Sequence, residues 1–294
     1  MRPPPATDRL SQSLELAIGG NRDALVSLLA RGSRLPGTRA NDALADSFAQ
    51  ACRTLGARAD AVALGLAHLS ADEAPGASAL EFLPVCGVVA LGARAAVDKG
   101  VRKRFVAELH ARADDPRFRV RDAVVGALAR VGAGAGDELV EAVAGWMDGY
   151  FHAAAVLRAL AQEAWLGRLE TAGPVIARLD EAFQLALDAP RAAARYPGHK
   201  ALLEALHRTP GVIALRFGVP VFDVMLRWGS VKDPVMRDVS ATVLEDPKLA
   251  GRFGPDVERV RRALDASRPP VRNPDHDFGP TRDRSGARRG GRRA

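Results

Sequence analysis

A short phrase that occurs twice in the chain constrains its fold more than any other feature. Asp115-Pro116 precedes an apolar stretch that contains Arg121, and Asp233-Pro234 precedes one that contains Arg237. Each copy has the form of a loop that starts a helix, because Asp caps a helix and Pro is tolerated in its first turn. Repetition of such a phrase predicts an array of stacked helix pairs.

Weaker copies extend the pattern over most of the chain. Pro or Gly breakers at positions 36, 75, 116, 149, 190 and 234 lie 33 to 44 residues apart, close to the ~40–47 residues of a two-helix unit. Apolar residues recur at helical spacing between them, as in Leu44, Phe48, Ala51 and Leu55, which favours amphipathic helices over strands. The second helices of the units are expected at 43–55, 79–91, 120–131, 153–166, 192–206 and 235–244.

With these features the chain resembles the HEAT-repeat (armadillo-like) family over residues 20–246. The resemblance implies an all-α fold, an α-solenoid of about six HEAT-like helix pairs. In that family a loop Asp and an Arg of the second helix join a ladder between adjacent units. The matching residues here are Asp115 with Arg121 and Asp233 with Arg237, and the other units lack part of the pattern. The resemblance implies no activity, because the family is defined by its shape.

Three segments are expected along the chain: an N-terminal segment with a capping helix (1–20), the helical array (21–266) and a tail rich in Arg and Gly (267–294). The chain has a net charge of +7, and the tail holds eight Arg against three Asp. Because the tail has almost no apolar residue to bury, it is expected to be disordered. It could hold nucleic acid or an acidic protein by charge, or it could be solvated without a partner. The candidate contacts are Arg284, Arg288, Arg289, Arg292 and Arg293.

Composition indicates which residue types form the core and in which cellular compartment the protein is expected. Hydrophobic residues make up 47% of the chain but aromatic residues only 5%, so the core is expected to consist of Ala, Leu and Val. Cys52 and Cys86 lie in apolar helical contexts and are expected to be buried free thiols. The longest apolar run, 82–93, ends at Arg94, short of the ~18 residues of a membrane span. The start of the chain lacks the apolar core of a secretory signal. A cytoplasmic protein without membrane contact is therefore expected.

The sequence contains no catalytic signature. Gly132, Gly134 and Gly136 join two predicted helices without the strand that a dinucleotide motif needs. The six histidines include no pair spaced four residues apart, and Asp275-His276-Asp277 is expected to be a solvated turn. We therefore expect no enzyme, no cofactor and no metal site.

A sharper alternative comes from two tryptophans and an acidic residue. Bacterial alkylpurine DNA glycosylases are built from HEAT-like repeats and use Trp and an acidic residue in a cleft. Trp146, Asp148 and Trp165 match those residue types, although Trp146 at an apolar helical position also fits a core residue. The alternative function is therefore a nucleic-acid-associated HEAT-like protein, in its sharpest form a repair glycosylase.

The second helices of a HEAT array line its concave face, and their polar residues are the candidate binding positions. Their charges alternate in sign, whereas a duplex-binding surface needs a continuous basic track. We therefore expect a non-catalytic scaffold or adaptor that binds another protein; a HEAT-type lyase or maturation factor is disfavoured because no nucleophile stands in a recognisable setting. The candidates are Asp42, Asp46, Gln50, Arg53, Arg119, Asp122, Arg130, Arg158, Gln162, Lys200, Glu204 and His207.

Two proline segments are expected to interrupt the array. Tyr196-Pro197 falls within the fifth predicted second helix, and Pro220 falls within the next first helix. Because proline inside a helix kinks or breaks it, these segments are expected to change the curvature of the array or to form a pocket or partner loop.

Overall fold

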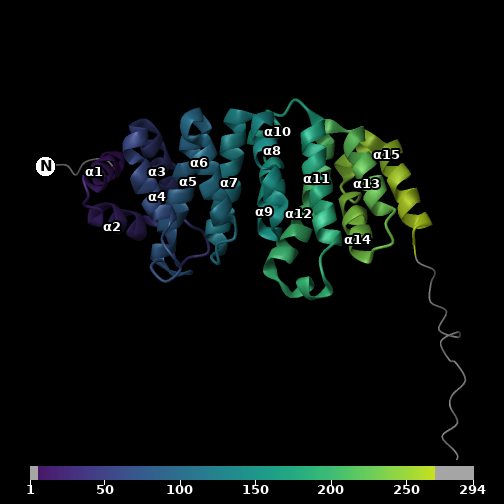
Figure 1. The fold of residues 1–294 in the computed structure, drawn as a ribbon, viewed down its shortest axis with the longest axis horizontal. Helices are drawn as coiled ribbons and strands as arrows, with labels where there is room; N and C mark the ends of the chain where they lie inside the picture. The colour runs from purple at the N-terminus through teal and green to yellow at the C-terminus, as the bar shows by residue number, and fades with distance from the viewer. Residues whose placement is uncertain (1–5, 269–294) are drawn as a thin grey trace, which may run out of the picture.

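The computed structural model describes residues 6–268, and this part of the chain is helical throughout (Figure 1). It contains fifteen α-helices, three short 3-10 helices and no strand. The predicted all-α class is confirmed for these residues.

The helices form two rows along the long axis of the molecule, which the chain follows from α1 at one end to α15 at the other (Figure 1). In the first row α1 packs on α4, α8 on α11, α11 on α13, and α13 on α15. This row consists of α1 (Ala6–Ile18), α4 (Ala57–Ala67), α6 (Lys99–Ala113), α8 (Asp137–Ala142), α11 (Ala172–Leu187), α13 (Val219–Gly229) and α15 (Pro247–Ala266).

In the second row every helix packs on the next. Its members are α3 (Asp42–Leu55), α5 (Phe82–Val97), α7 (Phe118–Ala135), α9 (Tyr150–Leu160), α12 (Pro197–Phe217) and α14 (Pro234–Val243). They correspond to the six predicted second helices. Such packing between neighbours is the property of a helical repeat. The remaining elements are α2 (Asp23–Gly32), α10 (Glu163–Leu166), η1 (Ala79–Glu81), η2 (Ala144–Asp148) and η3 (Arg191–Arg195).

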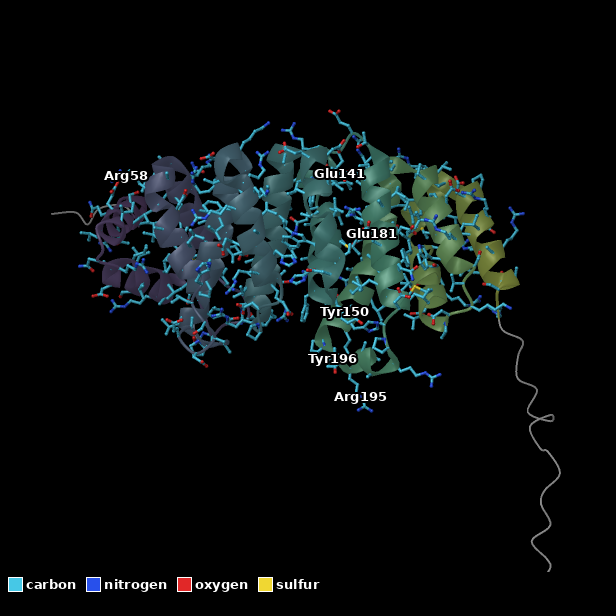
Figure 2. All side chains as sticks on the ribbon, viewed as in Figure 1. Arg58, Glu141, Tyr150, Glu181, Arg195 and Tyr196 are labelled. Carbon is cyan, nitrogen blue, oxygen red and sulfur yellow. The ribbon has the colours of Figure 1, made fainter. Side chains whose placement is uncertain are left out.

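Both proline segments interrupt the helical pattern, as expected, and each proline lies at the start of the helix that follows the break. α12 starts at Pro197, and Pro220 lies in the first turn of α13. Proline is tolerated there because the first N–H groups of a helix have no acceptor within it. Gly218, with φ of 68°, ends α12 and turns the chain directly into α13. Just before α12 the exposed side chains of Arg195 and Tyr196 project from the lower edge of the molecule (Figure 2).

A buried arginine connects the third unit to the loop before it. The carboxylate of Asp115 accepts a hydrogen bond from Nη2 of Arg117 at 2.7 Å, and both side chains are buried. The same guanidinium donates to three backbone carbonyls 43 to 48 residues earlier in the chain, at 2.8 to 3.0 Å. Those carbonyls belong to Leu69, Ser70 and Ala74. Arg117 therefore makes the contact between units that the repeat pattern assigned to Arg121.

The two arginines predicted for the ladder make other contacts. Arg121 donates to the backbone carbonyl of Asp115 and not to its carboxylate. Arg237 donates to the hydroxyl of Ser267 after α15, while Asp233 caps the first turn of α14. Both arginines are structural, as predicted, but their partners were wrong.

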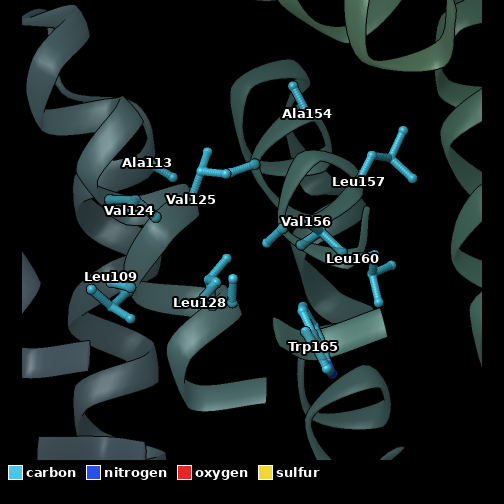
Figure 3. Close-up of a cluster of buried hydrophobic side chains, with 14 of the residues drawn as sticks. Leu109, Ala113, Val124, Val125, Leu128, Ala154, Val156, Leu157, Leu160 and Trp165 are labelled. Atoms are coloured by element: carbon cyan, nitrogen blue, oxygen red, sulfur yellow. The ribbon is translucent and has the colours of Figure 1, made fainter. Parts of the chain in front are cut away.

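Aliphatic side chains fill the space between the rows. Figure 3 shows this core where α6, α7 and α9 meet, with Leu109, Val124 and Leu128 fully buried, and Trp165 lying below them. Leu128 has no exposed surface. This agrees with a core built from small and branched residues.

Helix α5 lies at the centre of the packing. Ala79–Val97 is the one helical segment among the described residues that is long and apolar enough to cross a membrane, and 78% of its most apolar window is buried inside the fold. That burial against α3, α4, α6 and α7 is typical of a core helix. Cys86 on α5 and Cys52 on α3 are buried free thiols, as predicted. Burial, with a smaller contribution from the nearby Asp60 carboxylate, raises the pKa of Cys52 to about 12.

The contact between α4 and α5 depends on Gly87. A Cβ at this position would lie 2.3 Å from the backbone nitrogen of Ala67, and helix backbone cannot move aside as a side chain can. We expect Gly87→Ala to lower the free energy of unfolding by ~1–3 kcal/mol, although Ala is the better helix former. Urea denaturation followed by circular dichroism measures the change.

Gly126→Ala on α7 is the matched control. No heavy atom lies within 4 Å of the Cβ that this substitution would add. It should leave the free energy of unfolding unchanged or raise it by up to ~1 kcal/mol through helix propensity. An equal loss of stability in both variants would show that close packing is not the cause.

Candidate functional site

A groove runs over one face of α5, between α3 and α7. Its floor contains Val85, Val89, Ala93 and Ala96. Residues spaced by three or four positions share one face of a helix, so these four side chains form a continuous stripe. Two hollows of about 540 and 630 Å³ lie over this stripe, one toward the start of α7 and one toward α1.

The groove exists because the floor residues are small. Longer side chains from α3 and α7 rise on both sides of α5, whereas alanine and valine leave the space above it free. Gly126 on α7 adds to this space, since a Cβ there would meet nothing within 4 Å.

One ion pair spans the groove from wall to wall. Nη2 of Arg130 on α7 lies 2.6 Å from Oδ1 of Asp46 on α3, and both side chains line the two hollows. The Arg130 side chain is 38% exposed and the Asp46 side chain 58%. An exposed pair of this kind contributes about 0–1 kcal/mol to stability, so an incoming ligand can displace it at little cost.

The mouth of the groove at the start of α7 carries an aromatic side chain beside an anchored cation. Phe118 is 54% exposed, and the guanidinium carbon of Arg119 lies 4.5 Å from its ring centroid. Arg119 is held by Glu81 at 2.9 Å and by the carbonyl of Gly37 at 3.2 Å. The sequence reasoning missed Phe118, although an apolar residue at the exposed start of a helix is visible in the sequence.

Six charged residues surround the hollow of about 540 Å³, three of each sign. The cations are Arg39, Arg119 and Arg130, and the anions are Asp42, Asp46 and Asp122. Five of these six are predicted binding residues. The hollow is therefore electrically balanced and not a basic track.

The remaining predicted residues lie along the same row of helices or beside it. Gln50 and Arg53 line the hollow toward α1. Arg158 on α9 pairs with Asp122 at 2.8 Å, and His207 on α12 lies 3.1 Å from Asp238 on α14.

Three further candidates are exposed but do not line the groove. Lys200 and Glu204 lie on α12, where Glu204 pairs with Arg208 at 3.2 Å. Gln162 lies between α9 and α10, at the N-cap of the latter. The tail candidates, Arg284 to Arg293, lie outside the described residues.

The residues of the glycosylase alternative do not form one open cleft. Trp165 is fully buried, and its indole N–H donates to the carbonyl of Gly136 at 3.1 Å. Trp146 is 4% exposed and packs edge-on against His110. Both tryptophans thus occupy packed positions, which for Trp146 agrees with the core interpretation.

Asp148 takes part in a different group, which sequence reasoning missed. Together with His110 and His152 it forms the one cluster of three metal-ligating side chains among residues 6–268. Burial alone would raise the pKa of Asp148, but hydrogen bonding to His110 and the nearby imidazoles lower it below its usual value. The Asp148-to-His152 spacing of four residues could have suggested part of this group, but His110 lies 38 residues before Asp148.

Comparison with known proteins adds no assignment. No protein-family model matches the chain, and no curated protein matches it.

Proposed function

We propose that this protein is a HEAT-like α-solenoid that acts as a non-catalytic cytoplasmic scaffold and binds a helical segment of another protein in the α5 groove. The observation that carries the proposal is the apolar stripe from Val85 to Ala96 between two polar walls. This pattern suits an amphipathic helix, which places one apolar face into a groove and its polar faces against the rims.

The dimensions of the groove support a helix as its occupant. Eleven residue steps separate Val85 from Ala96, which corresponds to about 16 Å at 1.5 Å per residue, or three helical turns. Packed helix axes lie about 8–10 Å apart, so the axes of α3 and α7, with α5 between them, are about 16–20 Å apart. A helix that lies over α5 midway between them is then at least about 8–10 Å from each wall axis, which is the usual packing distance.

The chemistry of the groove defines the partner further. A floor of Val and Ala leaves room for larger apolar side chains on the incoming helix, such as Leu, Met or Phe at helical spacing. Phe118 provides an aromatic contact at one end. Because cations and anions alternate on the walls, the flanks of the partner helix should carry charges of both signs.

The alternative, a nucleic-acid-associated protein, depends on the tail. The charge balance of the groove gives a phosphate backbone no continuous basic surface. Nucleic-acid binding by this protein would therefore depend on the tail, residues 267–294, and should weaken steeply with salt.

The proposal is tested by capturing partner proteins from the native cell, with the unmodified chain and with a variant whose groove is filled. Gly126→Leu adds a side chain over the groove floor, where the position is open, without entering the core. We expect it to reduce the recovery of the partner proteins by about tenfold or more, equivalent to at least ~1.4 kcal/mol of binding free energy. The recovered protein should then be mapped to a helical peptide, and titration of that peptide compares the two variants directly.

Gly173→Leu is the matched control, because Gly173 on α11 is also helical, exposed and open, but lies away from the groove. It should recover the same partners as the unmodified chain, and nuclease treatment should change nothing. Recovery that is unaffected by Gly126→Leu would exclude the groove. Recovery that disappears with nuclease, or with removal of residues 269–294, would favour the nucleic-acid alternative.

A further inference from the structure

The cluster of His110, Asp148 and His152 joins three elements at the boundary between the two rows. His110 comes from α6, Asp148 is the last residue of η2, and His152 lies in the first turn of α9. Their possible ligand atoms all lie within 4.8 Å of one another. No residue of this cluster belongs to the α5 groove.

The distances between these atoms approach those of a coordination sphere. Nε2 of His110 lies 3.1 Å from Oδ2 of Asp148, and Nδ1 of His152 lies 2.9 Å from Oδ1 of the same carboxylate. Zinc bonds to nitrogen and oxygen are about 2.0–2.2 Å long, so ligand atoms of a tetrahedral site are separated by about 3.3–3.5 Å. The donor atoms are therefore already collected at nearly the required spacing.

The two imidazoles approach the carboxylate side by side. Their centroids are 4.0 Å apart and their planes are inclined by 20°. The torsion about the Cβ–Cγ bond of histidine is broad, so small rotations of the two rings can direct both lone pairs toward one point beside Asp148. Trp146 packs edge-on against both rings, at 5.0 Å from His110 and 6.2 Å from His152.

The buried ring nitrogen of His152 has a charged neighbour but no well-formed hydrogen bond. Nδ1 of His152 lies 2.9 Å from Oδ1 of Asp148, and it makes no hydrogen bond of standard geometry. Space beside this nitrogen is kept by Gly149, where a Cβ would lie 2.8 Å from Nδ1. A buried polar group normally has a partner, and a metal ion that accepts the lone pair of Nδ1 would provide one.

The site also has a route to solvent. His110 and Trp146 line a cavity of about 580 Å³ between α6 and α8, together with Lys99, Arg102 and Lys103. An ion at the cluster would have three protein ligands, and its remaining position could take water or a small anion from this cationic cavity.

We propose that His110, Asp148 and His152 bind a divalent transition-metal ion, with Zn²⁺ as the best match to two imidazole nitrogens and one carboxylate oxygen. The carboxylate lies between the two rings, and a fourth position would be open to exchange. This site is independent of partner binding in the α5 groove, so either proposal can fail without the other.

Titration of the full-length chain with Co²⁺ tests the site, because tetrahedral Co²⁺ gives intense visible absorption that hexahydrated Co²⁺ lacks. We expect one Co²⁺ per chain, displaced by Zn²⁺. His152→Ala and Asp148→Asn should each weaken Co²⁺ binding by at least about tenfold. Even the loss of a group that only supports a metal ligand typically lowers metal affinity by about 10–100-fold. Circular dichroism establishes that each variant is folded.

Gly149→Ala provides a variant that retains all three ligands. It fills the space next to Nδ1 of His152 and should also weaken Co²⁺ binding. His207→Ala is the matched control, because His207 lies 3.1 Å from a carboxylate but belongs to no cluster of three ligating side chains among residues 6–268. His276→Ala controls for chelation by the tail. Co²⁺ absorption that is absent from the unmodified chain, unchanged in His152→Ala, or lost equally in His207→Ala would overturn the proposal.

Discussion

Replacing Arg117 with Met should lower the free energy of unfolding by about 3–5 kcal/mol, the range for breaking a buried ion pair on one side. The substitution leaves the buried Asp115 carboxylate without its cation. It also removes the donor that three carbonyls of the preceding inter-helix loop share. Equilibrium denaturation at neutral pH measures the loss.

Two variants identify the cause of this loss. Asp115→Asn combined with Arg117→Met removes the unpaired charge and should recover part of the stability. Arg58→Met removes an exposed arginine that pairs with Glu15, and it should cost no more than about 1 kcal/mol. A similar loss in Arg58→Met and Arg117→Met would show that burial of the pair is unimportant.

The dependence on pH gives an independent check of the Asp115 pair. Burial alone would raise the pKa of Asp115, but hydrogen bonds from the Arg117 side chain and backbone outweigh this effect and lower it. Because the pKa of Asp115 is lower in the folded state, its ionised carboxylate stabilises the protein at pH values above the unfolded pKa of about 3.9. This stabilisation is lost as the pH falls through the pKa of the folded state. The stability difference between the unmodified chain and Arg117→Met should therefore shrink between neutral pH and pH values near or below about 3.

Leu128→Ala should lower the free energy of unfolding by about 2–5 kcal/mol, the range for deleting a buried leucine side chain. Leu128 has no exposed surface, and it packs in the core where α6, α7 and α9 meet (Figure 3). Because Leu128 is enclosed by packed helices of both rows, the surrounding side chains can fill the vacated space only in part, and a cavity should remain. Chemical denaturation followed by tryptophan fluorescence and by circular dichroism measures the change.

Leu16→Ala on α1 is the matched control, since Leu16 is 52% exposed. It should change the free energy of unfolding by no more than about 0.5 kcal/mol. Leu128→Met, which nearly conserves volume, should cost less than about 1.5 kcal/mol. A loss in Leu128→Ala no larger than that in Leu16→Ala would contradict its role in the core.

The helical character of the chain and the approximate positions of the second-row helices could be predicted from its residues alone. Both depend on local properties: the period of apolar residues, and the breakers between them. The burial of Leu128 and of both cysteines followed from the same patterns, because an apolar residue on the inner face of an amphipathic helix has only the core to occupy. The breaks at the two proline segments also followed from the sequence, because proline is tolerated in the first turn of a helix but not in its interior.

Which residues contact one another could not be predicted in this way, because it depends on how the helices pack. Arg117 and Arg121 lie one helical turn apart, and packing against the preceding loop selects Arg117 as the partner of the Asp115 carboxylate. The α5 groove needs three helices at once, since the small residues of α5 leave a hollow only where α3 and α7 rise beside them. His110 meets Asp148 and His152 because α6 and α9 belong to neighbouring units. The period of apolar residues along the chain shows which face of a helix is buried. Contacts between helices depend instead on how far the units are shifted and rotated against one another.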